Sequence, residues 1–398
     1  IWTRTSSFLG AAVESPSYGL TLKTDAEGVS SGFRINISSY LVLPFANTPT
    51  ASANATGSIV WSTGNAAVYL DTSLGAESAL SETNAFYHMN KVKDYFDRDT
   101  ASSGFLNIDP ITPSQTHPAN LSVQVPVMVH ANGAVDDTMK DGADNGMNNA
   151  FYDLENDNIM IGDGYYRGGV YRSIALDGTV IRHEYVHSVI NRIYPIINFG
   201  EFGAISEALA DYFALASFWR EYDTEGGDAV KNTLTILGNF IAGESLSRNL
   251  AGDAVNCPSD GICNMPTDWK GQVHDDSPIL SQALYDLRKG GNALGNFAGH
   301  PAYGTLAKTD VFAYAALFYF PDNFANFYDA FVEACKLLDD GGCPAAMQTK
   351  ILAVFGAHGV PGYMSGADIY DTTPTGELCY NHNGPECASD ISALYSLR

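Results

Sequence analysis

The chain has 398 residues, a length that suggests two or three domains. Hydrophobic residues make up 45% and charged residues 17%, which is typical of a globular protein and excludes a wholly disordered chain. The formal net charge of −24 disfavours binding to nucleic acid or to acidic membrane surfaces, because both are themselves negatively charged. No apolar run approaches the roughly 20 residues that cross a bilayer, so we expect a soluble protein.

The first part of the chain is predicted to form a β-rich N-terminal domain, residues 1–177. Runs with strand-like composition occur at residues 57–61 and 121–129, among segments rich in Ser, Thr, Gly and Asn. Residues 81–96 place apolar side chains at helical spacing and are predicted to form one helix within this domain.

From residue 178 onward the pattern changes to long amphipathic segments, which predicts a mainly helical C-terminal domain over residues 178–360. Residues 361–398 are interpreted as a C-terminal extension with two cysteines and little periodicity. The predicted fold class is therefore α+β.

Cysteines occur as three close pairs along the chain. The pairs are Cys257 and Cys263, Cys335 and Cys343, and Cys379 and Cys387. None forms a Cys-x-x-Cys motif, which argues against a thiolate zinc site, whereas local pairs are typical of disulfide-closed loops in an oxidising compartment. The alternative is free buried thiols in a cytosolic protein. No basic-then-apolar signal segment opens the chain, so we expect a secreted form to be processed before Ile1.

The most informative segment is residues 180–190, where His183 and Glu184 are followed by His187 in the pattern His-Glu-x-x-His. On an α-helix, residues four apart lie on one face, so both imidazoles can bind one metal ion. Glu184 lies about a quarter-turn away and can reach a water on that metal rather than the metal itself. The alternative is a solvated helix face with two ordinary histidines.

A third candidate ligand, Glu207, follows in a second segment with helical periodicity. Zinc in a hydrolase is held by three protein ligands and keeps one open position. Apolar residues at helical spacing surround Glu207; they are Ile205, Leu209, Tyr212, Phe213 and Ala216. Glu207 and Asp211 share one face, so Asp211 could accept a proton from a ligating imidazole and fix its tautomer. The alternative is two exposed helix charges.

These residues resemble the thermolysin family of gluzincin metalloproteases, with fungalysin-type enzymes as relatives. The His-Glu-x-x-His motif is followed, after 19 intervening residues, by a Glu in the context Gly-Ala-x-x-Glu-Ala-x-x-Asp. The resemblance implies that His183, His187 and Glu207 are zinc ligands. It also implies that Glu184 is the general base and that Asp211 is the partner of a ligand histidine.

The resemblance extends upstream to residues 149–153 and 158–164, which are similar to the family's edge strand and the hairpin after it. It implies that Asn149 and the carbonyl of Ala150 hold an extended peptide substrate by β-augmentation. The alternative is an ordinary hairpin turn.

Downstream, His274 precedes a helix that we predict to begin at residues 276–278 and to end at residues 290–291. By position it resembles the family histidine that stabilises the oxyanion of the tetrahedral intermediate, and the alternative is a capping or surface histidine. Arg248 resembles the arginine that binds the substrate carbonyl beyond the scissile bond.

The chain departs from the family pattern at two positions near these residues. An Asp is usual five residues before the stabilising histidine, but this position is Trp269, and Asp268 lies one residue further away. A tyrosine that helps to bind the intermediate is replaced by Asn198. The group that orients His274 is therefore left open, and His274 would bind the oxyanion alone or with another donor.

The double calcium site that is common in the family is expected to be absent. Its two acidic positions correspond here to Thr179 and Phe218, and neither can supply a carboxylate. Calcium takes roughly six to eight oxygen ligands, several of them usually charged. Single calcium ions could still bind at acidic segments such as residues 136–144 or 153–157.

Together these features predict a secreted, extracellular, monomeric zinc endopeptidase, made as a zymogen, that acts on peptides or proteins. The zinc cleft would lie between the two domains, and the resemblance implies cleavage before bulky apolar residues, with Val180 and Tyr171 as pocket candidates. Three alternatives stay open: an exopeptidase, a catalytically inactive binding or toxin module, and a scaffold with structural zinc. An exopeptidase would need an amine-anchoring motif such as Gly-x-Met-Glu-Asn, which the sequence lacks.

Overall fold

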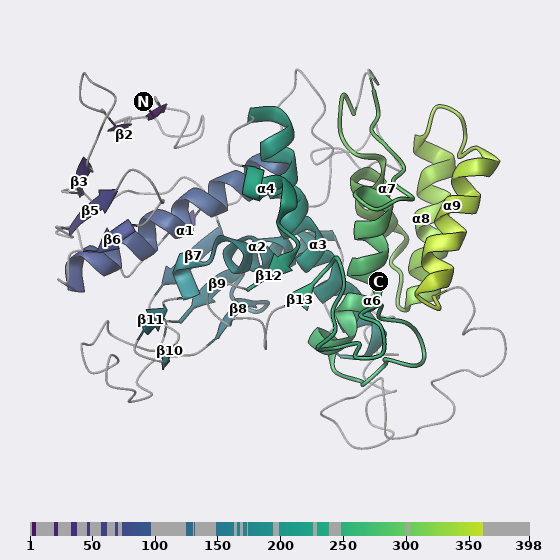
Figure 1. Ribbon diagram of the computed structural model, residues 1–398, viewed down its shortest axis with the longest axis horizontal. Helices are drawn as coiled ribbons and strands as arrows, with labels where there is room; N and C mark the ends of the chain where they lie inside the picture. The colour runs from purple at the N-terminus through teal and green to yellow at the C-terminus, as the bar shows by residue number, and fades with distance from the viewer. Residues whose placement is uncertain are drawn as a thin grey trace. The chain divides into compact units, whose positions relative to one another are not determined.

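The computed structural model describes most of the chain between residues 74 and 360 (Figure 1). The described ranges are 74–96, 125–129, 131, 149–162, 165–167, 170–172, 174–193, 199–225, 229–238, 248–298, 300 and 303–360, with short strands at 2–4, 20–22, 33–37, 46–47, 57–61 and 68–70. These ranges are rich in helix and contain several small sheets, which agrees with an α+β class. Within them, no helix combines the length and the apolar character that crossing a bilayer requires.

The chain divides into two compact units. One comprises residues 1–94, 121–188 and 238–243, and the other comprises residues 95–120, 189–237 and 244–398. The domain limits predicted from the sequence, at residues 177 and 360, stay predictions, as does a cleft between domains.

The main sheet of the first unit has four strands in the order β4-β7-β9-β8. The strands are β4 (Ala46–Asn47), β7 (Val125–Val129), β9 (Asn158–Ile161) and β8 (Ala150–Asp153). β7 runs parallel to both β4 and β9, whereas β8 and β9 form an antiparallel hairpin. Side chains at Val125, Val127 and Val129 are buried, the period of two expected for a strand with one face on the core.

β8 and β9 form a hairpin where the edge strand and hairpin of residues 149–153 and 158–164 were expected. Ala150 pairs with Ile161 and Asp153 pairs with Asn158. Asp153 Oδ1 accepts the backbone N–H groups of Glu155 and Asn156 at 3.0 and 3.2 Å, which closes the turn. β8 is the last strand in the order β4-β7-β9-β8.

The other strands form small sheets of two or three. In the three-stranded sheet, β5 (Gly57–Trp61) lies between β3 (Phe33–Ile37) and β6 (Val68–Leu70). Three two-stranded sheets are formed by β1 (Trp2–Arg4) with β2 (Leu20–Leu22), β10 (Tyr165–Arg167) with β11 (Val170–Arg172), and β12 (Ile236–Leu237) with β13 (Arg248–Asn249). All these pairs are antiparallel. The strand predicted at residues 57–61 is confirmed as β5.

Three long helices precede residue 226. They are α1 (Leu74–Phe96), α2 (Gly178–Ile193) and α3 (Gly200–Glu225), with a 3₁₀ turn, η3 (Ile174–Leu176), before α2 and a short helix, α4 (Ala229–Thr233), after α3. The helix predicted for residues 81–96 is confirmed and begins seven residues earlier. α3 is buried on every side between residues 201 and 221, as expected for a helix at the centre of a core.

The remaining helices belong to the second unit. They are α6 (Val273–Arg288), α7 (Lys308–Ala316), α8 (Phe324–Leu338) and α9 (Ala345–Ala357), with a 3₁₀ turn, η4 (Leu317–Tyr319), after α7. α7, α8 and α9 lie side by side (Figure 1). Their aromatic side chains pack edge to face or tilted: Phe331 contacts Phe312 at 5.7 Å and Phe355 at 5.5 Å between ring centroids.

α6 begins at Val273, three residues before the predicted start, so His274 lies inside its first turn. The prediction treated Pro278 as a first-turn residue because proline lacks a backbone N–H. In the structure Pro278 lies deeper in the helix, and the Ser277 hydroxyl lies 3.1 Å from the carbonyl of His274. Its single proton can go to this acceptor, which the N–H of residue 278 would otherwise serve, or to Asp211 at the same distance.

Two of the three predicted disulfides lie in the described part of the chain, and both are present. Cys257 is bonded to Cys263, and Cys335 is bonded to Cys343, with Cα–Cα distances of 5.1 and 5.2 Å. Within the described residues no cysteine is free. The predicted pair of Cys379 and Cys387 lies outside the described residues.

Candidate metal centre

His183 and His187 lie one turn apart on α2, and both side chains are buried. Asp177 begins this helix as an N-cap: its Oδ1 accepts from the backbone N–H of Thr179 at 3.0 Å and from its hydroxyl at 2.6 Å. The helix brings Nε2 of His183 to within 3.0 Å of Nε2 of His187, with the two rings almost perpendicular at 87°. The spacing of four residues therefore brings the two Nε2 atoms close enough to bind one metal ion.

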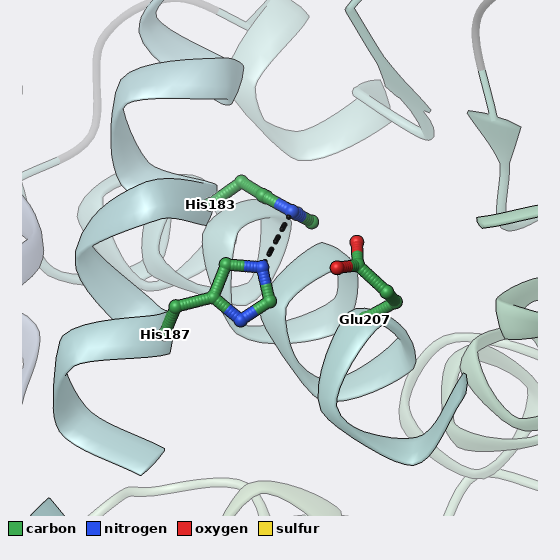
Figure 2. Close-up of side chains that lie close together, drawn as sticks. All are labelled: His183, His187 and Glu207. Carbon is green, nitrogen blue, oxygen red and sulfur yellow. Dashed lines mark hydrogen bonds between the residues drawn. The ribbon is translucent and has the colours of Figure 1, made fainter. Parts of the chain in front are cut away.

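Glu207, on α3, completes a group of three buried residues with the two histidines. Figure 2 shows its carboxylate directed toward the space beside the two imidazole rings. One ligand atom from each residue lies within 4.8 Å of the others. Among the described residues this is the group of histidine, cysteine and carboxylate side chains that is compact enough to hold a metal ion.

The residues of this group fit a zinc ion. Around tetrahedral zinc, nitrogen ligands at about 2.0–2.1 Å from the metal lie about 3.3 Å from each other. The 3.0 Å between the two Nε2 atoms is close to that separation. Two imidazoles and one carboxylate are also a ligand set of catalytic zinc sites that keep a fourth position open.

Glu184 follows His183 directly on α2 and is buried, with 5% of its surface exposed. The group of three candidate ligands does not include it. A carboxylate next in sequence to a candidate ligand, but outside the ligand group, is compatible with the expected action on a water molecule. Its role as general base stays a prediction.

His274 approaches the same group from the first turn of α6. Its Nε2 lies 3.4 Å from Oε2 of Glu207, and about half of its side chain (48%) is exposed. The structure therefore brings this histidine to the candidate ligand, although the two residues are far apart in the sequence.

The orientation of His274 involves Gln272, which the sequence analysis did not identify. The Gln272 amide nitrogen lies 3.1 Å from His274 Nδ1. Asp268, the acidic residue nearest to the family's usual position, instead accepts from the backbone and side chain of Asn264 at 3.0 and 3.1 Å. A polar residue at the N-cap, two positions before a histidine in the first turn, is the sequence signal that would have indicated Gln272.

Asp211 and Arg248 form a bidentate ion pair that was not predicted. Nε and one terminal nitrogen of Arg248 each donate to a different oxygen of Asp211 at 2.6 Å. The hydroxyl of Ser277 lies 3.1 Å from Oδ2 of Asp211 and can donate to it. The terminal nitrogen of Arg248 that donates to Asp211 also lies 3.9 Å from Oε2 of Glu207. Asp211 is fully buried, so this pairing compensates its charge and fixes the guanidinium next to Glu207.

Comparison with known proteins gives relatives among metalloproteases, although no protein-family model matches the chain. The thermostable neutral protease NprT of Geobacillus stearothermophilus is 29% identical over 241 residues, 58% of this chain and 40% of that protein. Thermolysins of Alicyclobacillus acidocaldarius subsp. acidocaldarius and Bacillus caldolyticus are each 31% identical over 166 residues, 40% of this chain and 28% of theirs. The chain thus spans less than half the length of these relatives.

The solved structure of the precursor of protealysin, a metalloproteinase from Serratia proteamaculans, resembles the fold. The two share 18% sequence identity with a TM-score of 0.50, over 82% of this chain and 89% of that chain. The sequence is thus similar to those of thermolysin-family metalloproteases. The resemblance found from the sequence motifs is thereby confirmed.

Two of the substrate-binding residues expected from the thermolysin family, Asn149 and Ala150, lie at an edge of the main sheet. The Asn149 carbonyl accepts from the backbone N–H of Gly162 at 2.9 Å, and Ala150 begins β8. An edge strand is the place where an extended peptide can add to a sheet. Peptide binding at Asn149 and Ala150, and at Arg248, stays a prediction.

The positions of the thermolysin-family calcium site are filled differently here. The Thr179 hydroxyl accepts the backbone N–H of Gly238 at 2.9 Å while it donates to Asp177, and Phe218 is buried. The absence of the double calcium site stays a prediction, as do single calcium ions elsewhere. Asn198 and the side chain of Tyr171 lie outside the described residues.

Proposed function

We propose that the chain is a zinc-dependent endopeptidase that hydrolyses internal peptide bonds. The observation that carries the proposal is the buried group of His183, His187 and Glu207, with Glu184 beside it on α2. The relatives named thermolysin and neutral protease support it at the level of the family.

The metal would be held by His183, His187 and Glu207, with Asp211 and Arg248 bracing the side of the site next to Glu207. When bound, zinc supplies a Lewis acid that polarises the scissile carbonyl and lowers the pKa of a bound water toward about 7.

Two side chains carry the proton transfer and the charge stabilisation. Glu184 accepts a proton from the attacking water at its carboxylate and delivers it to the nitrogen of the leaving amine. His274 donates from Nε2 to the oxygen of the tetrahedral intermediate, where negative charge develops. The 3.4 Å between Nε2 and Glu207 supports this role, because it places the donor next to a ligand of the metal.

The substrate would bind as an extended strand. Asn149 and Ala150, at the start of β8, would pair with its backbone, and Arg248 would bind a substrate carbonyl while Asp211 holds the guanidinium in place. We expect cleavage before bulky apolar residues, with Val180, which is half-buried, in the pocket wall.

The protein would act outside the cell as a monomer. The disulfides Cys257–Cys263 and Cys335–Cys343 support an oxidising compartment, because such bonds are rare in the reducing cytosol. Production as a zymogen belongs to the same proposal.

The test is cleavage of a peptide library by the full chain, with metal analysis of the same sample. We expect one zinc per chain, cleavage before bulky apolar residues, and loss of activity with 1,10-phenanthroline that zinc restores. Glu207→Ala should lower zinc occupancy, whereas Asp275→Asn, which removes a half-exposed carboxylate on α6, should not. Chelator-resistant cleavage, or full zinc retention in Glu207→Ala, would contradict the proposal.

A further inference from the structure

The side chain of Gln272 uses both ends of its amide at the start of α6. Its Oε1 accepts from the backbone N–H groups of His274 and Asp275 at 2.8 and 2.9 Å, so Gln272 is the N-cap of the helix. Two backbone donors can only face an oxygen, and this assigns the amide orientation without ambiguity. The amide nitrogen therefore faces His274 Nδ1, at 3.1 Å.

This contact determines which nitrogen of His274 carries the proton. An amide nitrogen donates hydrogen bonds and cannot accept them, so Nδ1 must be the acceptor and carry no hydrogen. The neutral imidazole then has its proton on Nε2. Nε2 is the atom that lies 3.4 Å from Oε2 of Glu207.

Gln272 is itself held in place by Asp276. The backbone N–H of Gln272 donates to Oδ2 of Asp276 at 2.8 Å, and that of Lys270 donates to Oδ1 at 2.8 Å. Asp276 is fully buried, so the backbone from which the Gln272 side chain extends is fixed. Half of the His274 side chain is exposed, and the amide thus restrains a ring that solvent would otherwise leave free to rotate.

We propose that Gln272 is a positioning residue for His274, holding the ring with its proton on Nε2 and directed toward the metal centre. The hydrogen bond stands on geometry alone, whereas its effect on turnover rests on the proposed endopeptidase function. Gln272 would thus restrain His274 in place of the aspartate that the chain lacks at Trp269. Its amide donates a hydrogen bond to Nδ1, whereas a carboxylate would accept one from it.

The first test separates this role from helix capping. Serine is a good N-cap but offers no donor to Nδ1, so Gln272→Ser keeps the cap and removes the contact. We expect kcat to fall about 10-fold with KM changed less than about twofold, because outright loss of an oxyanion donor costs about 10²–10³-fold. Asn323→Ser, the same exchange at the N-cap of α8, is the matched control and should leave kcat unchanged.

The second test does not depend on activity. Long-range ¹H–¹⁵N correlation spectra of the zinc-loaded protein report the tautomer of each histidine, and His274→Ala identifies the signal. We expect the Nε2–H form for His274 in the wild type and a mixture of both forms in Gln272→Ser. A Nδ1–H form in the wild type would overturn the proposal, even if the protein cleaved no peptide and the proposed function failed.

A double-mutant cycle supplies the third test. If Gln272 acts through His274, Gln272→Ser should lower kcat in the wild type and leave it unchanged in a His274→Ala background. An equal loss of kcat in both backgrounds, or full kcat in the single variant, would show that Gln272 has no role through this histidine.

Discussion

Glu184 and Glu207 are both buried carboxylates, but their neighbours assign them different chemistry. Oε2 of Glu207 lies 3.4 Å from His274 and 3.9 Å from Arg248, within the group that can hold a metal. Glu184 stands beside His183 outside that group. In the proposed function, Glu207 would bind the metal and Glu184 would move a proton.

Replacement of Glu184 by glutamine tests this division. Glu184→Gln should bind zinc and fold like the wild type but lose at least about 100-fold in kcat, because the amide cannot act as a general base. Glu333→Gln, on the exposed surface of α8, is a matched control that should be fully active. Retention of more than a tenth of wild-type turnover by Glu184→Gln would assign the base elsewhere.

At the scale of the element, the first turn of α6 decides where His274 lies. Gln272 caps the helix, the Ser277 hydroxyl lies within hydrogen-bond distance of the His274 carbonyl that Pro278 cannot serve, and Asp276 accepts two backbone N–H groups from the preceding loop. Burial, as the largest cause, raises the pKa of Asp276 to about 7 from 3.8, even though those N–H donors favour the charged form.

This raised pKa predicts how stability depends on pH. The folded state holds the proton of Asp276 more tightly than the unfolded state, so the contribution is fully present below about pH 4 and is lost as pH rises toward about 7. The loss amounts to a few kcal/mol, at about 1.4 kcal/mol per pKa unit. Asp276→Asn cannot ionise, so its free energy of unfolding, measured in urea, should rise relative to the wild type between pH 4 and 7.5. Parallel curves for the two proteins would contradict the prediction.

At the scale of the whole molecule, the second unit contains a buried charge network among its helices. Oδ1 of Asp310 on α7 accepts from the Tyr212 hydroxyl of α3 at 2.6 Å and from Nε of Arg288 on α6 at 3.1 Å. Burial and the neighbouring carboxylate raise the pKa of Tyr212 well above 10, so the phenol stays a donor. Asp310 thereby links α7 to α3 and α6 by hydrogen bonds.

Removal of one member should destabilise the unit as a whole. Asp310→Ala removes the closer carboxylate partner of the buried Arg288 guanidinium and leaves the contact with Asp223, and we expect a loss of about 3–5 kcal/mol in the free energy of unfolding. Lys336→Ala, which breaks an exposed pair with Glu333, should change it by less than about 0.5 kcal/mol. Equal effects of the two variants in chemical denaturation would refute the structural role of Asp310.

Features that depend on local spacing could be predicted from the sequence. The four-residue interval of His183 and His187 places both rings on one face of α2 because the helical repeat is fixed. The hairpin of β8 and β9 and the disulfides Cys257–Cys263 and Cys335–Cys343 likewise join residues that are close in the chain. Such contacts require little chain closure, so a pattern in the sequence predicts them.

The side chains that contact Asp211 could be identified from the tertiary structure but not from the sequence. Arg248 and Ser277 are 37 and 66 residues away from it, and no periodicity links them. The start of α6 was also decided there, because the position of Pro278 allowed two helix starts and the contacts of Gln272 and Asp276 select one. A spacing along one helix is set by the backbone, whereas contacts between elements depend on how the whole chain closes on itself.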